Sequence, residues 1–365
     1  MPLNYSLDDL LRQMPALNAS DLHLRVGEPP VFRVHGRLER LSQYPVLEPG
    51  DPEEIMLSIM DERRQTTYRQ MWEMDMAYEL EDVARFRVNC FRQKGHLGAV
   101  LRRIPIDIQT IDELGLPAIL KQVALLPRGL VLVTGPTGSG KSTTLAAMVD
   151  EINRSLRKHI VTIEDPIEFV HLDKKCIINQ REIGQDTHSF PAALKRVVRQ
   201  APDVILVGEM RDLETISLAI TAAETGHLVF ATLHTTDAMQ TVDRAIDVFP
   251  PQQQPQIRTQ LAVTLQAVVC QALLPLKVGR GRVPAFEVML GTLGVRAAIR
   301  EGKTHMLYNM IQAGADDGMI VLDQHLVGLV KEEVVSFEQA LAKSSYPKEF
   351  YMRCGVQPPD DSSVA

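Results

Sequence analysis

The sequence predicts an α/β protein of two domains, and three observations support this prediction. With 365 residues, 45% of them apolar, the chain is long enough for more than one packed core. Residues 1–103 alternate short strand-like and helix-like segments, whereas residues 118–350 contain continuous apolar strands separated by helices. Continuous apolar strands are typical of a parallel sheet that is covered on both faces. Residues 104–117, with two prolines and one glycine, are predicted to link the two domains.

In the N-terminal domain, Ser6 is placed to cap a helix that extends through Met14. Apolar and polar residues then alternate in four segments, and a polar stretch between them favours helix. The expected elements are strands at 21–26 and 31–35, a helical region at 52–72, and a strand pair at 85–91 and 97–102. Together they predict a small domain of helices and antiparallel sheet.

Residues 85–103 carry six arginine or lysine residues and no acid. Alternation along a strand turns every second side chain outward, so a solvated strand face explains this pattern. A local basic patch with a functional role is the alternative. The whole chain has a formal net charge of −7, which disfavours a general nucleic-acid-binding surface.

In the second domain, apolar runs predict neighbouring parallel strands at 129–134, 160–163, 204–207 and 228–233. Apolar residues at helical spacing predict core helices at 190–198 and 257–272. Residues 351–365, which become rich in proline, aspartate and serine, predict a disordered tail.

Neither a membrane span nor a secretory signal is predicted. The longest apolar stretch, 261–276, is interrupted by polar residues and proline, and falls short of the roughly 20 residues that a spanning helix needs. Asp8 and Asp9 occupy the place of a signal's basic region. The cysteines are far apart and are expected to be free thiols: Cys90, Cys176, Cys270 and Cys354. The sequence therefore predicts a cytoplasmic protein.

The most informative segment is Gly135–Thr144, which matches the pattern GxxxxGK[ST] directly after a predicted strand and before a predicted helix. Glycines allow a tight turn whose backbone N–H groups point inward, and the helix N-terminus adds positive partial charge. Lys141 then reaches the β- and γ-phosphates, and the Ser142 hydroxyl binds Mg²⁺. The predicted nucleoside triphosphate site consists of Gly135, Pro136, Thr137, Gly138, Ser139, Gly140, Lys141, Ser142 and Thr143.

Acidic residues follow two of the predicted strands, at the edge where parallel sheets bind nucleotides. Glu164 and Asp165 precede Pro166; they either bind Mg²⁺ or orient a water, or they are surface acids before a turn. Glu209 is the single acid of a Walker-B pattern, with Gly208 where an acid is more usual. We expect Glu209 to bind Mg²⁺ through water, because Mg²⁺ keeps several waters and takes only one or two carboxylates.

Two histidines, His227 and His234, bracket the predicted strand 228–233. A single histidine is most often an ordinary core or surface residue. A pair around a strand beside a phosphate loop favours His234 as a sensor of the γ-phosphate.

Together with Ala19–Leu24 (ASDLHL), these motifs resemble the type II/IV secretion ATPase superfamily, and within it the pilus-retraction ATPases of twitching motility. The resemblance covers about residues 5–345. It implies a PAS-like α+β domain followed by a RecA-like P-loop ATPase domain with a mainly parallel sheet. It also implies that Glu164 is the catalytic glutamate, Glu209 the Walker-B glutamate and His234 the histidine-box residue.

Two features favour retraction over extension. Extension and secretion ATPases of this superfamily carry an additional N-terminal domain and a four-cysteine zinc module, and neither is expected here. Residues 294–301 (GVRAAIRE) resemble the AIRNLIRE segment that family members need for retraction. They keep Arg296, Ile299, Arg300 and Glu301 and differ at Gly294, Val295, Ala297 and Ala298. The alternatives are an accessory retraction paralogue, a secretion or DNA-transfer ATPase, and a nucleotide-gated binding module without catalysis.

The resemblance further implies a homohexameric motor that hydrolyses ATP with Mg²⁺ and powers pilus retraction. Arg87 and Arg102 or Arg103 would enter the neighbouring subunit's site, where positive charge stabilises the γ-phosphate in the transition state. The expected partner is an inner-membrane platform protein at the base of the pilus, and a second retraction ATPase is a further candidate. No nucleic acid is expected. The motor would be cytoplasmic and peripherally associated with the inner membrane.

Overall fold

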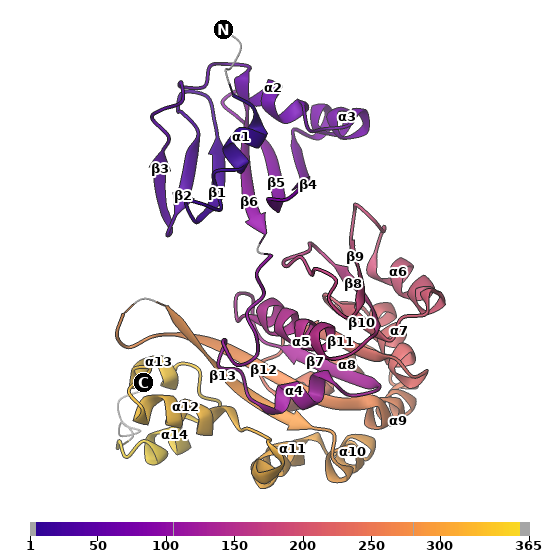
Figure 1. The fold of residues 1–365 in the computed structure, drawn as a ribbon. Coiled ribbons are helices and arrows are strands. Elements are labelled where there is room, and N and C mark those ends of the chain that lie inside the picture. Colours follow the sequence, from indigo (N-terminus) through magenta and orange to yellow (C-terminus); the bar gives the residue numbers. More distant parts are fainter. Residues whose placement is uncertain (1–4, 105, 280, 358–365) are drawn as a thin grey trace. The chain divides into compact units, whose positions relative to one another are not determined.

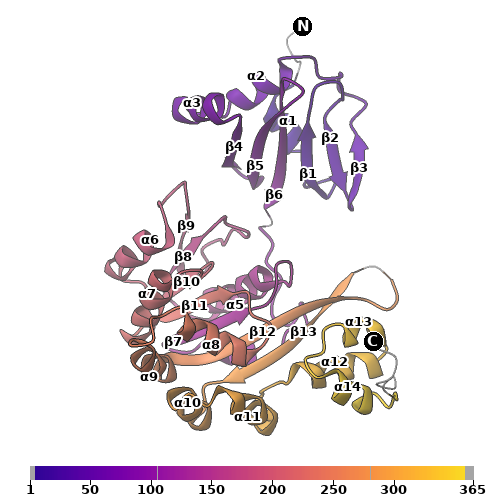
Figure 2. The same ribbon diagram turned by 180° about the vertical axis from the view of Figure 1, so that it is seen from behind.

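The computed structural model describes residues 5–104, 106–279 and 281–357. These residues form two compact units. One contains the chain up to residue 107 together with 168–170, and the other contains 108–167 and the chain from 171 onward. The ribbons in Figures 1 and 2 show the elements of each unit. Of the predicted tail, 358–365 lie outside the described residues, and helix α14, Pro347–Arg353, extends past residue 351.

The N-terminal unit is one antiparallel sheet with three short helices (Figure 1). Its strands are β1 (Ala19–Leu24), β2 (Val31–Val34), β3 (Arg37–Arg40), β4 (Glu73–Leu80), β5 (Ala84–Gln93) and β6 (His96–Ile104). Its helices are α1 (Leu7–Leu11), α2 (Asp51–Leu57) and α3 (Glu62–Met71). The strand order is β3-β2-β1-β6-β5-β4. Ser6 caps α1 as predicted, but α1 ends at Leu11 and turns follow it.

The second unit contains a seven-stranded sheet, and its strand order is β13-β12-β7-β11-β10-β8-β9. All neighbouring pairs are parallel except β12 with β13. The strands are β7 (Gly129–Thr134), β8 (His159–Glu164), β9 (Ile177–Glu182), β10 (Val204–Val207), β11 (Leu228–Leu233), β12 (Leu265–Pro275) and β13 (Arg282–Leu290). The predicted fold class, an antiparallel α+β unit followed by a mainly parallel P-loop unit, is confirmed.

Helices cover both faces of this sheet, as the continuous apolar strands predict. Alternate residues of each strand belong to opposite cores: Leu130 packs with the first core and Val131 with the second. The first face is covered by α6 (Phe190–Val197), α7 (Leu213–Glu224), α8 (Ala238–Asp247), α9 (Gln254–Thr264), α10 (Leu293–Arg300) and α11 (Leu307–Ala313). The second is covered by α4 (Ile119–Ala124) and α5 (Lys141–Ser155). Helices α12 (Leu322–Lys331), α13 (Phe337–Leu341) and α14 pack on β12 and β13 as a separate core (Figure 1).

The predicted helix at 257–272 is wrong beyond Thr264, where α9 ends and β12 begins directly. Nearly every residue of β12 is buried, so the strand shows no alternation that would distinguish it from a buried helix. Pairing with β7 on one side and β13 on the other favours the extended form. Strands β3, β4, β9 and β13 were not predicted at all.

A buried carboxylate, Glu287 of β13, links the sheet to two helices. It is 5% exposed and accepts a hydrogen bond of 2.8 Å from the N–H of Ala238, the first residue of α8. The N–H of Leu322, the first residue of α12, also bonds to it. Burial raises the pKa of Glu287 to about 7, and the nearby carboxylates of Asp237 and Asp323 contribute to this rise. The negative charge is therefore costly, although two helix N-termini partly compensate it.

This geometry predicts how stability depends on pH. Because the folded-state pKa of Glu287 lies above its ordinary value, the native state is favoured while the side chain is protonated, and this advantage declines as pH rises through about 7. We expect Glu287→Gln to gain about 2 kcal/mol relative to wild type between about pH 5.5 and about pH 8.5. Thermal unfolding of both proteins at both pH values measures this change in relative stability. Any loss of stability from the changed hydrogen bonds is the same at both pH values and therefore cancels. A difference in melting temperature that does not change with pH would contradict the assignment.

Candidate active site

The predicted functional segments of the second unit come together because their strands are in register. Thr134 of β7 pairs with Leu233 of β11, and Val207 of β10 pairs with both Ala231 of β11 and Ile163 of β8. The carboxyl ends of four parallel strands therefore reach the same edge of the sheet. Glu164 is the last residue of β8, and the phosphate loop, Glu209 and His234 follow the ends of β7, β10 and β11.

The phosphate loop has the backbone conformation that its glycines allow. Gly135, Gly138 and Gly140 all have positive φ angles, of 140°, 78° and 94°. A Cβ atom on Gly135 would lie 2.3 Å from the carbonyl oxygen of Gln271, and one on Gly140 would lie 2.7 Å from the Gln271 side-chain nitrogen. The loop thus lies directly against β12, and no larger residue fits at these two positions. It leads into α5 at Lys141, so the helix N-terminus faces the loop.

Lys141 is held over the phosphate loop. Its Nζ donates hydrogen bonds to the carbonyl oxygens of Gly135, at 2.7 Å, and Pro136, at 3.1 Å. Burial lowers the pKa of Lys141, and the negative charge of Glu209 partly offsets this effect. An ammonium that is half-buried, and whose hydrogen bonds within the described residues go to neutral carbonyls, gains strongly from a phosphate oxygen.

Two serines complete the loop. Ser139 is buried, and its Oγ has no hydrogen-bond partner within the described part of the chain. Ser142, in the first turn of α5, is exposed. A buried hydroxyl without a partner and an exposed hydroxyl at the helix start both fit a bound nucleotide, the second as a ligand of its Mg²⁺.

Glu209 and His234 are in direct contact, although 25 residues separate them. One carboxylate oxygen of Glu209 lies 2.8 Å from Nε2 of His234 and 2.6 Å from Nε of Arg211. Burial raises the pKa of Glu209, but the hydrogen bond from Arg211 and the charge of His234 outweigh burial, so its pKa lies below the ordinary value. The carboxylate is therefore ionised at neutral pH. The other histidine, His227, bonds to the backbone oxygen of Ala222 at the opposite end of β11, away from this edge.

The structure explains why glycine precedes Glu209. A Cβ atom on Gly208 would lie 3.1 Å from the carbonyl oxygen of Ile163 and 3.2 Å from Cα of Glu164. A side chain at this position would require the backbone of β8 to shift by a few tenths of an ångström, whereas Glu209, one residue later, presents its carboxylate at the tip of β10.

Glu164 belongs to a different group at the same edge. Its Oε1 accepts hydrogen bonds from Oγ1 of Thr162, at 2.5 Å, and from Nε2 of Gln180, at 3.2 Å. Strands β11 and β10 separate β8 from β7, which corresponds to about 14 Å along the sheet. Glu164 thus faces the phosphate loop from across the site, while Glu209 lies between them.

The predicted arginines lie on the N-terminal unit, not on the unit that carries Lys141. Arg87 of β5 is exposed and pairs across the strands with Arg102 of β6. Arg102 donates to the buried carboxylate of Asp21 at 2.8 Å, and Arg33 contacts the second oxygen of that carboxylate at 3.3 Å. Burial raises the pKa of Asp21, but the bond from Arg102 outweighs it and the pKa is lowered. Asp21 therefore anchors a row of arginines on this sheet.

Sequence reasoning did not assign a role to Gln271 or Arg211. Gln271, 5% exposed, accepts a hydrogen bond of 2.7 Å from Oγ1 of Thr144 in α5 and contacts both outer glycines of the phosphate loop. A polar residue inside an otherwise apolar run was the only signal available. Arg211 follows Glu209 closely, but its contact with that carboxylate depends on the turn after β10.

A RecA-like sheet with a phosphate loop, a strand-end glutamate and a histidine at one edge defines a P-loop nucleoside triphosphatase. Within this class, the chain belongs to the type II/IV secretion system protein family, whose model matches residues 1–322. Within the residues that the structure describes, no helix has both the length and the apolar character needed to cross a membrane.

Individual relatives match nearly the whole chain. The type IV pilus retraction ATPase PilT of Pseudomonas aeruginosa is 50% identical over 344 residues, which cover 94% of this chain and 99% of the relative. A twitching motility protein of Neisseria gonorrhoeae is 47% identical over 92% of this chain and 90% of its own length. A crystal structure of the pilus retraction motor PilT with bound ADP matches with a TM-score of 0.88 at 43% identity, covering 95% of this chain and 99% of that one.

The contact between Gln271 and Thr144 leads to a prediction about nucleotide affinity. We expect Gln271→Leu and Thr144→Val each to weaken binding of a nucleoside diphosphate about tenfold, because each leaves a buried polar group behind the phosphate loop without its partner. The double variant should lose little more than either single one, since both remove the same bond. Calorimetric titration measures all three affinities.

Gln266→Leu is the matched control, because Gln266 lies on the same strand but bonds to the backbone oxygen of Arg128 before β7 begins. Affinity losses that simply add in the double variant, or an equal loss in the control, would contradict a positioning role for Gln271.

Proposed function

We propose that this protein is an ATP-hydrolysing motor that powers the retraction of type IV pili in twitching motility. The observation that carries the proposal is the match to PilT along almost all of both chains, combined with a complete set of P-loop side chains at one sheet edge. A family match alone would also suit a binding module. An ionised Glu209 and a separate Glu164 at the same edge favour hydrolysis.

The residues of this chain divide the work at the nucleotide. The phosphate loop and α5 bind the phosphates through backbone N–H groups, and Lys141 exchanges its two carbonyl partners for β- and γ-phosphate oxygens. Mg²⁺, held by the hydroxyl of Ser142 and through water by Glu209, would supply positive charge that offsets charge on the phosphates.

Glu164 is the residue that we assign to the attacking water. It accepts hydrogen bonds from Thr162 and Gln180, which orient its carboxylate at the end of β8. From there the carboxylate can accept a proton from water as the water attacks the γ-phosphorus in line with the bond that breaks. His234 reports on the γ-phosphate, because its ring shares an oxygen of Glu209 with Arg211 and changes partners when that charge changes.

We infer that six copies form a ring and that the N-terminal unit completes its neighbour's site. Arg87 and Arg102 or Arg103 are the candidate donors, since positive charge at the γ-phosphate contributes about 10³- to 10⁵-fold in rate in related chemistry. Arg87 is exposed, and the exposed Arg102 is anchored by Asp21, so both are accessible on one sheet. Arg87→Ala should lower turnover while nucleotide still binds.

The proposed partner is an inner-membrane platform protein at the base of the pilus, with a second retraction ATPase as a further candidate. In this proposal the ring acts from the cytoplasmic side and is peripherally attached. Retraction then follows when loss of the γ-phosphate rotates one unit against the other about the connection near residues 104–117.

Hydrolysis tests the enzymatic part of the proposal. We expect Lys141→Ala to abolish phosphate release and to weaken nucleotide binding, because it removes the only side chain that we assign to the β- and γ-phosphates. Glu164→Gln should reduce phosphate release by about 10³-fold and leave ADP affinity within about twofold, because it removes proton acceptance but not phosphate contacts. Phosphate release by the assembled protein and calorimetry with ADP measure the two properties. Glu164→Gln with full turnover would contradict the assignment of this residue.

The direction of work is tested in cells. We expect deletion of the gene to leave cells with excess surface pili and no twitching, because fibres are still built but are not withdrawn. Complementation with the wild-type gene should restore movement, and complementation with Lys141→Ala should not. Cells without pili would indicate that the motor extends the fibre, and normal twitching would indicate that another motor suffices.

A further inference from the structure

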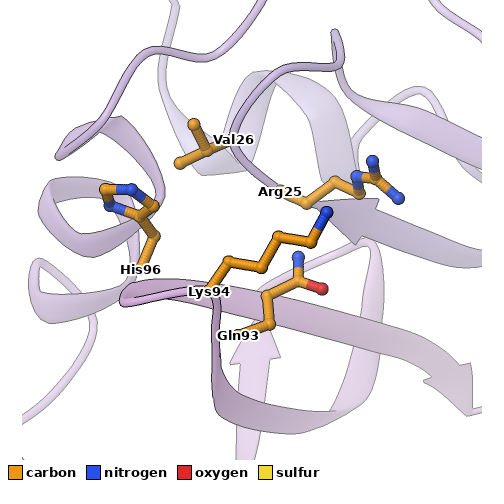
Figure 3. Close-up of a pocket in the computed structure, with 5 residues that line it drawn as sticks. All are labelled: Arg25, Val26, Gln93, Lys94 and His96. Carbon is orange, nitrogen blue, oxygen red and sulfur yellow. The ribbon is translucent and has the colours of Figure 1, made fainter.

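The proposed function leaves one end of the N-terminal sheet unexplained. A pocket of about 270 Å³ lies there, between the end of β1 and the turn that joins β5 to β6. It is lined by Arg25, Val26, Gln93, Lys94 and His96 (Figure 3). We propose that this pocket binds a phosphate group of a ligand other than the nucleotide at the P-loop.

The lining is rich in hydrogen-bond donors and has one sign of charge. Arg25 and Lys94 are cationic, His96 adds a ring N–H, and Gln93 adds an amide. In Figure 3 the side chain of Lys94 extends toward Arg25, the amide of Gln93 lies beside the Lys94 ammonium, and His96 lies on the other side of the pocket. Donors that surround a small volume from several directions fit the three terminal oxygens of a phosphate group better than the two of a carboxylate.

Within the described part of the chain, the positive charge of this group is only partly offset by an acid. The negative charge of Glu28 interacts with Arg25. The Glu28 carboxylate is itself held by Arg40, with contacts of 2.7 and 3.1 Å. The arginines elsewhere on the same sheet differ in having a direct counter-charge, because Asp21 forms ion pairs with Arg33 and Arg102. Concentrated positive charge that Glu28 offsets only in part, on a chain whose formal net charge is −7, is a feature that an anionic ligand would stabilise.

Both walls of the pocket are held in place by contacts outside it. The turn that carries Lys94 is tight, with Gln93 paired to His96, and Arg92 donates to the carbonyl oxygen of Gly95 at 3.3 Å. The guanidinium of Arg92 also lies 5.0 Å from the ring of Trp72. On the other wall, the N–H of Gly27 bonds to the carbonyl oxygen of Leu47 at 2.9 Å. The donors are therefore presented on ordered backbone, which reduces the entropy lost on binding.

Trp72 provides a fluorescence signal for ligand binding at the pocket. It is the only tryptophan of the chain, and its ring lies against Arg92, next to the turn. The probe is inorganic pyrophosphate, titrated into the full-length protein while ADP saturates the P-loop. We expect a saturable change in tryptophan emission. In the variant Arg25→Ala/Lys94→Ala, binding should be weakened about tenfold or more, because two charge-assisted contacts are lost.

Arg37→Ala/Arg63→Ala is the matched control, since it removes the same charge from two exposed residues of the same unit, and Arg37 lies at the opposite end of the sheet. We expect it to bind pyrophosphate like the wild type. Equal melting temperatures for the three proteins would show that the exposed substitutions preserve the fold.

A second arm distinguishes a soluble ligand from a lipid headgroup. The same proteins are sedimented with vesicles of phosphatidylglycerol in phosphatidylcholine and with phosphatidylcholine alone. Binding to pyrophosphate supports a soluble phosphate compound as the ligand. Binding to the anionic vesicles alone supports a lipid headgroup. Either result counts only if the Arg25→Ala/Lys94→Ala variant loses that binding. The proposal is overturned if the wild type binds neither probe, if the variant binds as tightly as the control, or if a polyglutamate peptide binds in preference to both. None of these outcomes depends on ATP hydrolysis.

Discussion

The close approach of the phosphate loop to Gln271 is the constraint on which the active site depends. Gly135 and Gly140 both lie against this one residue of β12, and Thr144 bonds to its side chain from the first turns of α5. The loop, the helix and the strand are thereby held together at three points. Because a backbone N–H contributes to phosphate binding only when it points at the phosphate, a loop that is held before binding loses less entropy than a mobile one.

Glu209 adds a second constraint, and it concerns charge rather than shape. A single oxygen of this carboxylate contacts both Arg211 and His234, so any cation that approaches Glu209 competes with two existing partners. The charge of Glu209 also acts on Lys141. The side chains that would contact the γ-phosphate, Mg²⁺ and the histidine are therefore electrostatically connected before a nucleotide arrives. A change in charge at one of these groups therefore changes the hydrogen bonds and ion pairs of the others. A sensor of phosphate requires such a coupling.

The sequence identified the parts of the site that are encoded locally and missed those that depend on contacts between distant segments. The phosphate loop has its full pattern within ten residues, and Glu164, Glu209 and His234 each follow an apolar run, so their common edge follows from parallel pairing alone. Gln271 lies 127 residues from its partner Thr144, and no local pattern announces that pairing. The first part of β12 was predicted as helix because its pairing with distant strands cannot be read locally. Burial on both faces removes the alternation by which a strand is recognised.

The N-terminal sheet carries positive charge in two arrangements, and their difference bears on what each can do. In the row of Arg33 and Arg102, the buried Asp21 fixes the guanidinium positions and neutralises part of their charge. Such a row suits precise placement, as a residue acting on a neighbour's γ-phosphate needs. Around Lys94 and Arg25 the charge of Glu28 is shared with Arg40, and order comes from backbone hydrogen bonds and the contact between Arg92 and Trp72. That arrangement keeps most of its charge for an incoming anion, so the two proposals give the two ends of one sheet different phosphate groups.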